Sequence, residues 1–174
     1  MTGEVVFLLG GARSGKSRLG EQLVEATPGR WIYLATAEAL DDEMADRIAT
    51  HRSRRDSRWR TVEEPLDLPA ALAEWSAPDA AILVDCLTLW LSNLMGAGRD
   101  PARAVDALVQ ALGAVEGRVV LISNEVGQGI VPDNALARTF RDTAGRMHQA
   151  VAEAAHRVLF VAAGLPLTLK DVGR

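Results

Sequence analysis

The sequence predicts an α/β fold in which helices cover both faces of a mostly parallel sheet. Short runs rich in Val, Ile and Leu alternate along the chain with stretches whose apolar residues recur every three or four positions. The runs are typical of strands buried on both faces, and the stretches are typical of amphipathic helices. Because the two kinds of element alternate, the strands are expected to be parallel and joined through the helices.

The strands are expected where apolar runs are short and bounded by turn residues. The first run ends in two glycines, which indicate a tight turn between this strand and the helix that follows. We expect strands at residues 5–10, 31–35, 80–85, 119–123, 158–162 and 166–170.

The helices are expected between these strands. Leu40, Met44 and Ile48 recur at a spacing of four, and Pro101 stands in the first turn of another helix. A long helix follows Pro132, with apolar positions at helical spacing from 136 to 154, whereas the polar and basic residues 52–65 are expected to form a loop. We expect the remaining helices at residues 14–25, 38–51, 66–75 and 101–115, and after the 80–85 strand as far as residue 94.

Length and composition are those of an ordinary globular chain. The 174 residues predict a single domain over 1–174, and a net charge of −4 disfavours a general nucleic-acid binder. Cys86 is the one cysteine, which excludes an internal disulfide and fits a reducing compartment. Neither a targeting signal nor an apolar run long enough to span a bilayer is visible, so a cytoplasmic location is expected.

A phosphate-binding motif follows the first strand. The run has the pattern G-x-x-x-x-G-K-[ST] and opens a helix, the context that distinguishes a P-loop from an ordinary glycine-rich turn. Its backbone N–H groups are expected to cradle phosphates, Lys16 to act on the β- and γ-phosphates, and Ser17 to bind Mg²⁺. Lys16 is one of two lysines beside seventeen arginines, which suggests a need for a compact ammonium. The residues are Gly10, Gly11, Ala12, Arg13, Ser14, Gly15, Lys16 and Ser17.

Asp85 ends the apolar strand 80–85. A carboxylate in this place matches the second Mg²⁺ ligand of P-loop NTPases, and the alternative is an aspartate that caps the following helix. The fold expected for the chain is therefore P-loop NTPase-like, with GTP or ATP and Mg²⁺ at the carboxyl end of the sheet. No Asn-Lys-x-Asp element is present, so a regulatory GTPase that reads guanine in that way is disfavoured.

A basic segment surrounds His51. Residues 47–60 contain six arginines and one aspartate in an otherwise acidic chain. One interpretation is a solvated basic loop. The other is an anion site, because arginines bind phosphate oxygens in a bidentate manner and a neutral imidazole can attack an α-phosphate. His148 and His156 have weaker cases for a direct role, and no residue spacing suggests a zinc site.

These residues resemble one family over nearly the whole chain. The sequence is similar to the bifunctional adenosylcobinamide kinase / adenosylcobinamide-phosphate guanylyltransferases of cobalamin biosynthesis. Beyond the P-loop, the resemblance rests on segments with spacings far more specific than a single motif. These are 33–37, 41–44, 47–52, 59–64, 84–88, 123–127, 129–132, 140–142 and 145–146.

The resemblance implies two reactions and the residues that perform them. A nucleoside triphosphate phosphorylates adenosylcobinamide, and GTP then guanylylates a histidine that passes GMP to the new phosphate. His51 falls on that histidine, so His51 and Lys16 are the expected catalytic residues. The family also implies a homotrimer. Besides the P-loop, its nucleotide contacts fall on Ala35, Thr36, Ala37, Arg52, Ser53, Arg54, Arg55, Glu63 and Asp85.

Two positions depart from the family pattern, and two other functions stay open. Thr50 stands where some relatives have a second histidine, and His148 stands where asparagine is expected. A P-loop kinase that never forms a guanylylated intermediate is one alternative function. A P-loop NTPase switch whose output is a partner interaction is the other, and hydrolysis without a small acceptor is the observation that favours it.

Overall fold

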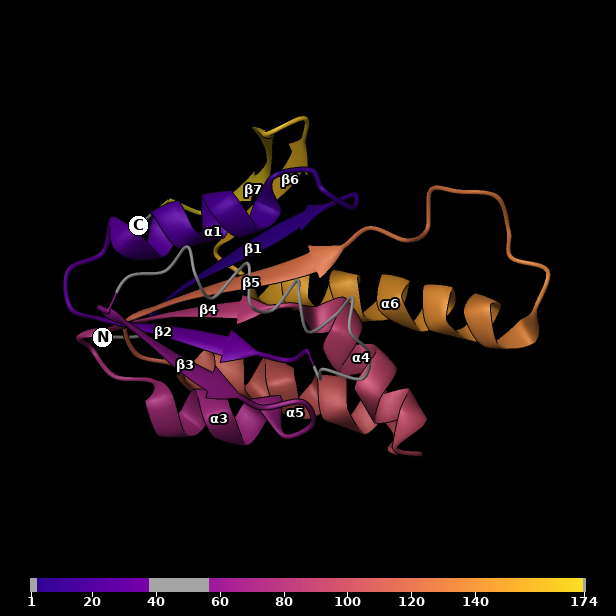
Figure 1. The fold of residues 1–174 in the computed structure, drawn as a ribbon, viewed down its shortest axis with the longest axis horizontal. Helices are drawn as coiled ribbons and strands as arrows, with labels where there is room; N and C mark the ends of the chain where they lie inside the picture. The colour runs from indigo at the N-terminus through magenta and orange to yellow at the C-terminus, as the bar shows by residue number, and fades with distance from the viewer. Residues whose placement is uncertain (1–2, 38–56, 174) are drawn as a thin grey trace.

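The computed structural model describes residues 3–37 and 57–173. The strands in these ranges form one seven-stranded sheet (Figure 1). The strand order is β3-β2-β4-β5-β1-β6-β7. Every pair of neighbours is parallel except β6 and β7, which are antiparallel. The strands are β1 (Glu4–Gly10), β2 (Arg30–Ala35), β3 (Trp59–Glu63), β4 (Ala80–Asp85), β5 (Arg118–Asn124), β6 (Arg157–Ala162) and β7 (Leu165–Asp171).

Helices cover both faces of the sheet, as the sequence predicts (Figure 1). One face carries α1 (Lys16–Glu25), and the other carries the remaining helices of the described residues. None of these helices combines the length and the apolar character needed to cross a membrane. The helices of the second face are α3 (Leu68–Trp75), α4 (Leu87–Gly96), α5 (Pro101–Ala114) and α6 (Ala135–Ala154).

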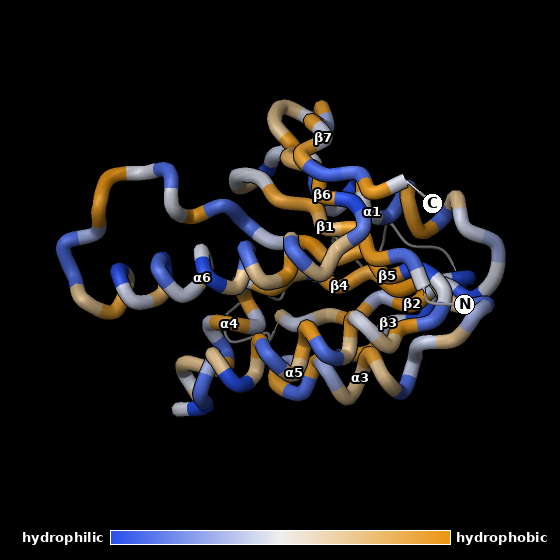
Figure 2. The backbone as a smooth tube through the Cα atoms, turned by 180° about the vertical axis from the view of Figure 1, so that it is seen from behind, coloured by the Kyte–Doolittle hydropathy of each residue, from blue (hydrophilic) through white to orange (hydrophobic). Residues whose placement is uncertain are grey.

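Two apolar cores lie on the two faces of the sheet. Successive residues of β1 point to opposite faces, so Phe7 belongs to the core under α3 to α6, and Leu8 belongs to the core under α1. Figure 2 shows the hydrophobic residues concentrated along the central strands. At Gly20, a Cβ atom would lie 2.7 Å from Leu83 Cδ1, so glycine lets α1 approach the sheet closely.

The prediction of a loop over 52–65 is wrong at residues 59–63, which form β3. Within the described part of the chain β3 is an edge strand that pairs only with β2, and Arg60 and Glu63 are exposed. Such a half-solvated strand lacks the apolar run that marks the central strands. Trp59 anchors it by packing against Trp31, with ring centroids 5.8 Å apart. The helix predicted over 38–51 lies outside the described residues.

The other predicted elements are confirmed, with ends that shift by a few residues. The final strand differs in direction, because β7 turns back on β6 to form a hairpin. The turn consists of Ala163 and Gly164, with φ angles of 51° and 79°. Positive φ at both central residues is the requirement of the type I′ turn, one of the two tight turns that most often join antiparallel strands.

Trp90 is expected to be a large single contributor to stability. Its side chain is fully buried in the core under α4, and its indole N–H donates to Leu66 O at 2.9 Å. Trp90→Ala should lower the free energy of unfolding by about 3–5 kcal/mol, measured by urea denaturation. Trp90→Phe keeps most of the apolar volume and should cost clearly less. Equal losses in the two variants would contradict this account.

Candidate nucleotide-binding site

The site predicted from the P-loop lies at the carboxyl edge of the sheet. β1 ends at Gly10, and α1 begins at Lys16 on the far side of the loop. In the strand register Gly10 faces Asn124 of β5, and Ala35 of β2 faces Asp85 of β4. The ends of four neighbouring parallel strands therefore converge beside the loop, which is where open α/β sheets bind ligands.

The conformation of the loop depends on its glycines. A Cβ atom at Gly10 would lie 2.3 Å from Val161 O, so only glycine fits between β1 and β6. Gly15 has φ 102°, which a residue with a side chain rarely adopts. At Gly11 a Cβ atom would meet nothing within 4 Å, so packing within the protein does not require glycine there. The loop is also tied to the β6–β7 turn by the Gly164 N–H, which donates to Ser14 O at 2.8 Å.

Lys16 lies inside this loop and is 5% exposed. Its ammonium donates to Gly10 O at 2.9 Å, to Gly11 O at 2.6 Å and to Ser14 Oγ at 3.3 Å. Burial lowers the pKa of Lys16, and electrostatic interactions with the Cys86 and Asp85 side chains oppose that shift. A compact cation with three donors thus sits at the centre of the phosphate-binding motif.

Ser17 and Asp85, the two predicted Mg²⁺ ligands, lie in contact. The Ser17 hydroxyl donates to Asp85 Oδ2 at 2.9 Å, and the Tyr33 hydroxyl donates to the same oxygen at 3.1 Å. The helix-capping alternative finds no support, because Cys86 is the N-cap of α4 and makes no side-chain capping bond. Sequence reasoning did not identify Tyr33, although a hydroxyl within an apolar strand next to β4 is a usable signal.

The end of β2 is tied firmly to β4. The Thr36 hydroxyl donates to Cys86 O and accepts from Cys86 N–H, both at 2.8 Å. Asn93 holds the same segment by donating to Thr36 O at 2.8 Å. Of the predicted nucleotide contacts, Thr36 is therefore fully buried with its hydroxyl bonded inside the protein, whereas Glu63 is exposed beside Ala35 at the edge of the sheet.

The remaining predicted site residues lie outside the described residues. They are His51, Arg52, Ser53, Arg54 and Arg55. The described chain before them ends at Ala37, directly after β2. Within the described ranges, no group of three or more His, Cys, Asp or Glu side chains could hold a metal ion.

His156 and Cys86 have structural roles. His156 Nδ1 accepts the Val5 N–H at 3.0 Å, which joins the start of β6 to β1. Cys86 is 4% exposed, and burial raises the pKa of its thiol, as does the neighbouring charge of Asp85. A buried neutral thiol is unsuited to nucleophilic catalysis, and Cys86 belongs to the core under α1.

The structure adds a polar group at the end of β5 that sequence reasoning did not assign. The Asn124 amide donates to Thr88 Oγ1 at 3.2 Å, and the Thr88 hydroxyl lies 3.1 Å from Cys86 Sγ. Glu125 follows directly, and its N–H donates to Gly10 O at 2.9 Å. The sequence signal that could have indicated these site residues is the polar run 123–125 at the end of an apolar strand.

Comparison with known sequences identifies the family. Residues 6–169 match the family model described as cobinamide kinase / cobinamide phosphate guanyltransferase. The chain belongs to this family. A family member from Pseudomonas aeruginosa, named bifunctional adenosylcobalamin biosynthesis protein CobP, is 51% identical, and the alignment covers 94% of this chain and 96% of that protein. The CobU protein of Salmonella typhimurium, with the same descriptive name, is 43% identical over 95% of this chain and 99% of its own.

Solved structures share the fold of this cobinamide kinase / guanyltransferase family member at low sequence identity. A Pyrococcus horikoshii OT3 protein aligns over 99% of this chain and 88% of its own, with a TM-score of 0.59 and 11% identity. The P4 protein of bacteriophage phi6, solved in complex with ADP, aligns over 94% of this chain and 52% of its own, with a TM-score of 0.52 and 18% identity. These likenesses support the P-loop NTPase-like α/β fold.

Proposed function

We propose that this chain phosphorylates adenosylcobinamide with a nucleoside triphosphate and then guanylylates the product through a His51–GMP intermediate, which gives adenosylcobinamide-GDP. Membership of the cobinamide kinase / cobinamide phosphate guanyltransferase family supports both reactions. The observation that carries the proposal is the contact between Ser17 and Asp85 beside the buried Lys16. This arrangement provides the cation, the hydroxyl and the carboxylate that phosphoryl transfer requires.

The phosphates of GTP or ATP bind in the P-loop, residues 10–17. Lys16 turns its ammonium from the loop oxygens to the β- and γ-phosphates, where it stabilises the charge that develops on the transferred group. Ser17 and Asp85 supply oxygen ligands of the kind that Mg²⁺ prefers, and a hydroxyl with one carboxylate suits a metal that is also bound by substrate phosphates. When bound, Mg²⁺ neutralises phosphate charge during transfer.

The rest of the nucleotide contacts the ends of β2 and β3 and the basic segment. Exposed Glu63 and buried Thr36 mark two sides of this region, and Ala35 and Ala37 border Thr36. The segment with Arg52, Ser53, Arg54 and Arg55 follows β2 in the sequence, and the carboxyl end of β2 pairs with the end of β4 that carries Asp85. Arginine side chains there would bind phosphate oxygens and offset the charge on the α-phosphate.

The nucleotidyl step proceeds in two displacements. An imidazole nitrogen of His51 bonds to the α-phosphorus of GTP, the bond to the α,β-bridging oxygen breaks, and pyrophosphate leaves with that electron pair. A phosphate oxygen of adenosylcobinamide phosphate then attacks the same phosphorus. The bond to His51 breaks, and the histidine is released.

Covalent labelling tests this proposal directly. Wild-type protein with Mg²⁺ and GTP labelled at the α-phosphate should acquire acid-labile, base-stable label without any acceptor, because a phosphoramidate forms at His51. His51→Ala should lose the label completely while adenosylcobinamide phosphorylation continues. ATP labelled at the same position is the nucleotide control. If the wild-type protein binds GTP but acquires no label, the guanylylated intermediate is excluded, and kinase activity is the only activity that remains proposed.

The protein is further proposed to be a cytoplasmic homotrimer, on the strength of the family resemblance. Leu165, Leu167 and Leu169 are exposed at alternate positions of β7, at 72%, 62% and 57%. Leu165 and Leu167 precede the register shift in the pairing of β7 with β6, so these two alternate residues share one face and form an apolar row at the edge of the sheet. An apolar row of this kind supports an interface between subunits. Light scattering coupled to gel filtration would measure the number of subunits.

A further inference from the structure

Glu125 lies next to the phosphate-binding loop because β5 is the neighbour of β1. Its N–H donates to Gly10 O at 2.9 Å, and the Lys16 ammonium donates to the same oxygen at 2.9 Å. The backbone of Glu125 and the ammonium of Lys16 therefore flank a single carbonyl. A side chain at this position can reach a group bound beside the γ-phosphate.

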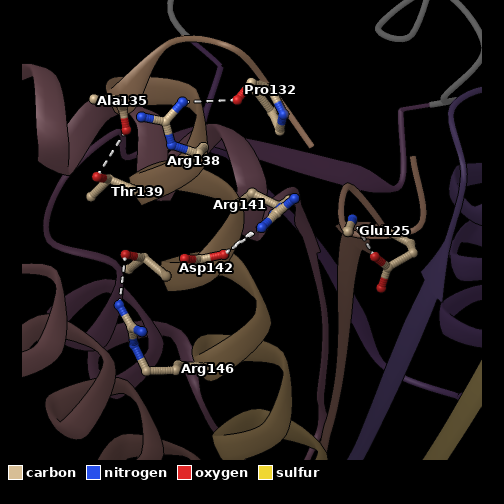
Figure 3. A network of polar contacts seen from close by, with 10 residues as sticks. Glu125, Pro132, Ala135, Arg138, Thr139, Arg141, Asp142 and Arg146 are labelled. Atoms are coloured by element: carbon tan, nitrogen blue, oxygen red, sulfur yellow. Dashed lines mark hydrogen bonds and ion pairs between the residues drawn. The ribbon is translucent and has the colours of Figure 1, made fainter. Parts of the chain in front are cut away.

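The Glu125 carboxylate is held in a defined direction. Oε1 accepts the Gly127 N–H at 2.5 Å, and Oε2 lies 4.0 Å from His148 Nδ1 (Figure 3 shows the first contact). The Glu125 side chain is 20% exposed, so part of it faces solvent. Among the residues that the structure describes, none forms a hydrogen bond to Oε2, which leaves this oxygen able to accept a proton from a ligand.

His148 approaches Glu125 from the core side of α6. It is 7% exposed, and its Nε2 lies 2.8 Å from Ser123 Oγ. Burial lowers the pKa of His148, and the nearby Glu125 charge opposes that shift. In a neutral imidazole that accepts the Ser123 hydroxyl at Nε2, the proton is on Nδ1, the nitrogen that faces Glu125. In that tautomer the Nδ1–H dipole points toward the Glu125 carboxylate, whose Oε2 lies 4.0 Å away.

Other carboxylates at this edge of the described structure are less suited to the same task. Asp85 accepts from Ser17 and Tyr33 and faces the proposed metal position. Glu64 Oε1 accepts the N–H groups of Leu66 and Asp67, so it stabilises a turn. Glu63 ends β3, and three strands separate β3 from β1.

We propose that Glu125 is the general base of the phosphoryl-transfer step and that His148 is its positioning residue. The inference rests on the proposed function and adds a residue to it. The acceptor hydroxyl oxygen bonds to the γ-phosphorus, and the bond from that phosphorus to the β,γ-bridging oxygen breaks. The nucleoside diphosphate leaves with the electron pair, and the hydroxyl proton moves to Glu125 Oε2, from which it passes to solvent.

Glu125→Gln separates this role from the rest of the site. The variant keeps the shape of the side chain and can still accept the Gly127 N–H, but the amide cannot take a proton at neutral pH. Its kcat for adenosylcobinamide phosphorylation should fall by about 10²–10⁴-fold. Self-labelling by GTP, and GMP transfer to adenosylcobinamide phosphate supplied ready-made, should stay at wild-type rates. Glu64→Gln is the matched control and should leave both reactions unchanged.

Two further variants test the positioning role. His148→Leu should lower the kinase kcat without raising KM for the nucleotide or slowing GMP transfer, and His148→Asn, whose amide can replace Nδ1–H, should restore part of the rate. Gly127→Ala should also lower the kinase kcat, because its Cβ would lie 2.9 Å from Glu125 Oε1 and displace the carboxylate. Melting temperatures of all variants identify any loss that is due to unfolding.

The outcomes are distinguishable. A Glu125→Gln protein that phosphorylates adenosylcobinamide at the wild-type rate overturns the inference and leaves the proposed function intact. A folded variant that loses phosphorylation and GMP transfer equally also overturns it, because Glu125 would then serve nucleotide binding. A wild-type protein that does not phosphorylate adenosylcobinamide overturns the proposed function and the inference together.

Discussion

Lys16→Met is expected to reduce both phosphoryl transfer and self-guanylylation by about 10²–10³-fold in kcat/KM, the usual effect of removing one preorganised donor to developing negative charge. Lys16 is 5% exposed, and its ammonium is held by three oxygens of the loop at 2.6–3.3 Å. Methionine fills a similar volume but carries no charge, so the fold should persist. Rates of the two reactions and nucleotide affinity by calorimetry measure the effect.

Lys16→Arg is the sharper control, because it keeps the charge and changes only the shape of the cation. A planar guanidinium cannot replace a compact ammonium that donates to Gly10 O, Gly11 O and Ser14 Oγ from the inside of a tight loop. The arginine variant should therefore lose activity nearly as fully as the methionine variant. Near-wild-type rates for Lys16→Arg would show that net charge alone is required at position 16.

Asp85→Asn is expected to lower the rates of both reactions by about 10²–10³-fold at millimolar Mg²⁺, because a metal ion contributes several kcal/mol of transition-state stabilisation. The asparagine oxygen can still accept from Ser17 and Tyr33, which donate to one carboxylate oxygen at 2.9 Å and 3.1 Å. What the variant loses is the negative charge that would hold the cation. Activity should therefore recover in part as the Mg²⁺ concentration is raised.

Tyr33→Phe is the matched control for Asp85→Asn. It removes one hydrogen bond to the carboxylate but keeps the charge, so activity and the Mg²⁺ dependence should change little. If Asp85→Asn shows wild-type rates at low Mg²⁺ concentration, Asp85 is not a metal ligand. If both variants lose activity to the same extent, the orientation of the carboxylate matters more than its charge.

Much of the fold could be predicted from the sequence because the central strands are buried on both faces. Such strands read as uninterrupted apolar runs, and β4 was predicted with the same ends that the structure shows, Ala80–Asp85. β3 could not be predicted in this way, since its solvated residues Arg60 and Glu63 break the apolar pattern. Its assignment depends on pairing with β2, a contact that no local window contains.

The site was predictable where spacing along the chain fixes geometry. The P-loop motif places Lys16 and Ser17, and the strand end places Asp85. Glu125 and His148 could not be connected from sequence, because the two residues belong to different elements and meet only when α6 packs on β5. Tyr33 could not be assigned to the site from the sequence for a similar reason, because its hydroxyl donates to Asp85 on the neighbouring strand.

The carbonyl groups that hold Lys16 each have a second donor. Gly10 O also accepts the Glu125 N–H at 2.9 Å, and Gly11 O also accepts the Ser14 N–H at 3.3 Å. When the ammonium turns to a phosphate, neither oxygen is left without a hydrogen bond, a loss that costs about 1–3 kcal/mol where the group is buried, as at Gly10. The Lys16 ammonium can therefore exchange the loop oxygens for phosphate oxygens of the nucleotide with little reorganisation of the loop. The binding free energy of the nucleotide is then not reduced by broken hydrogen bonds in the loop.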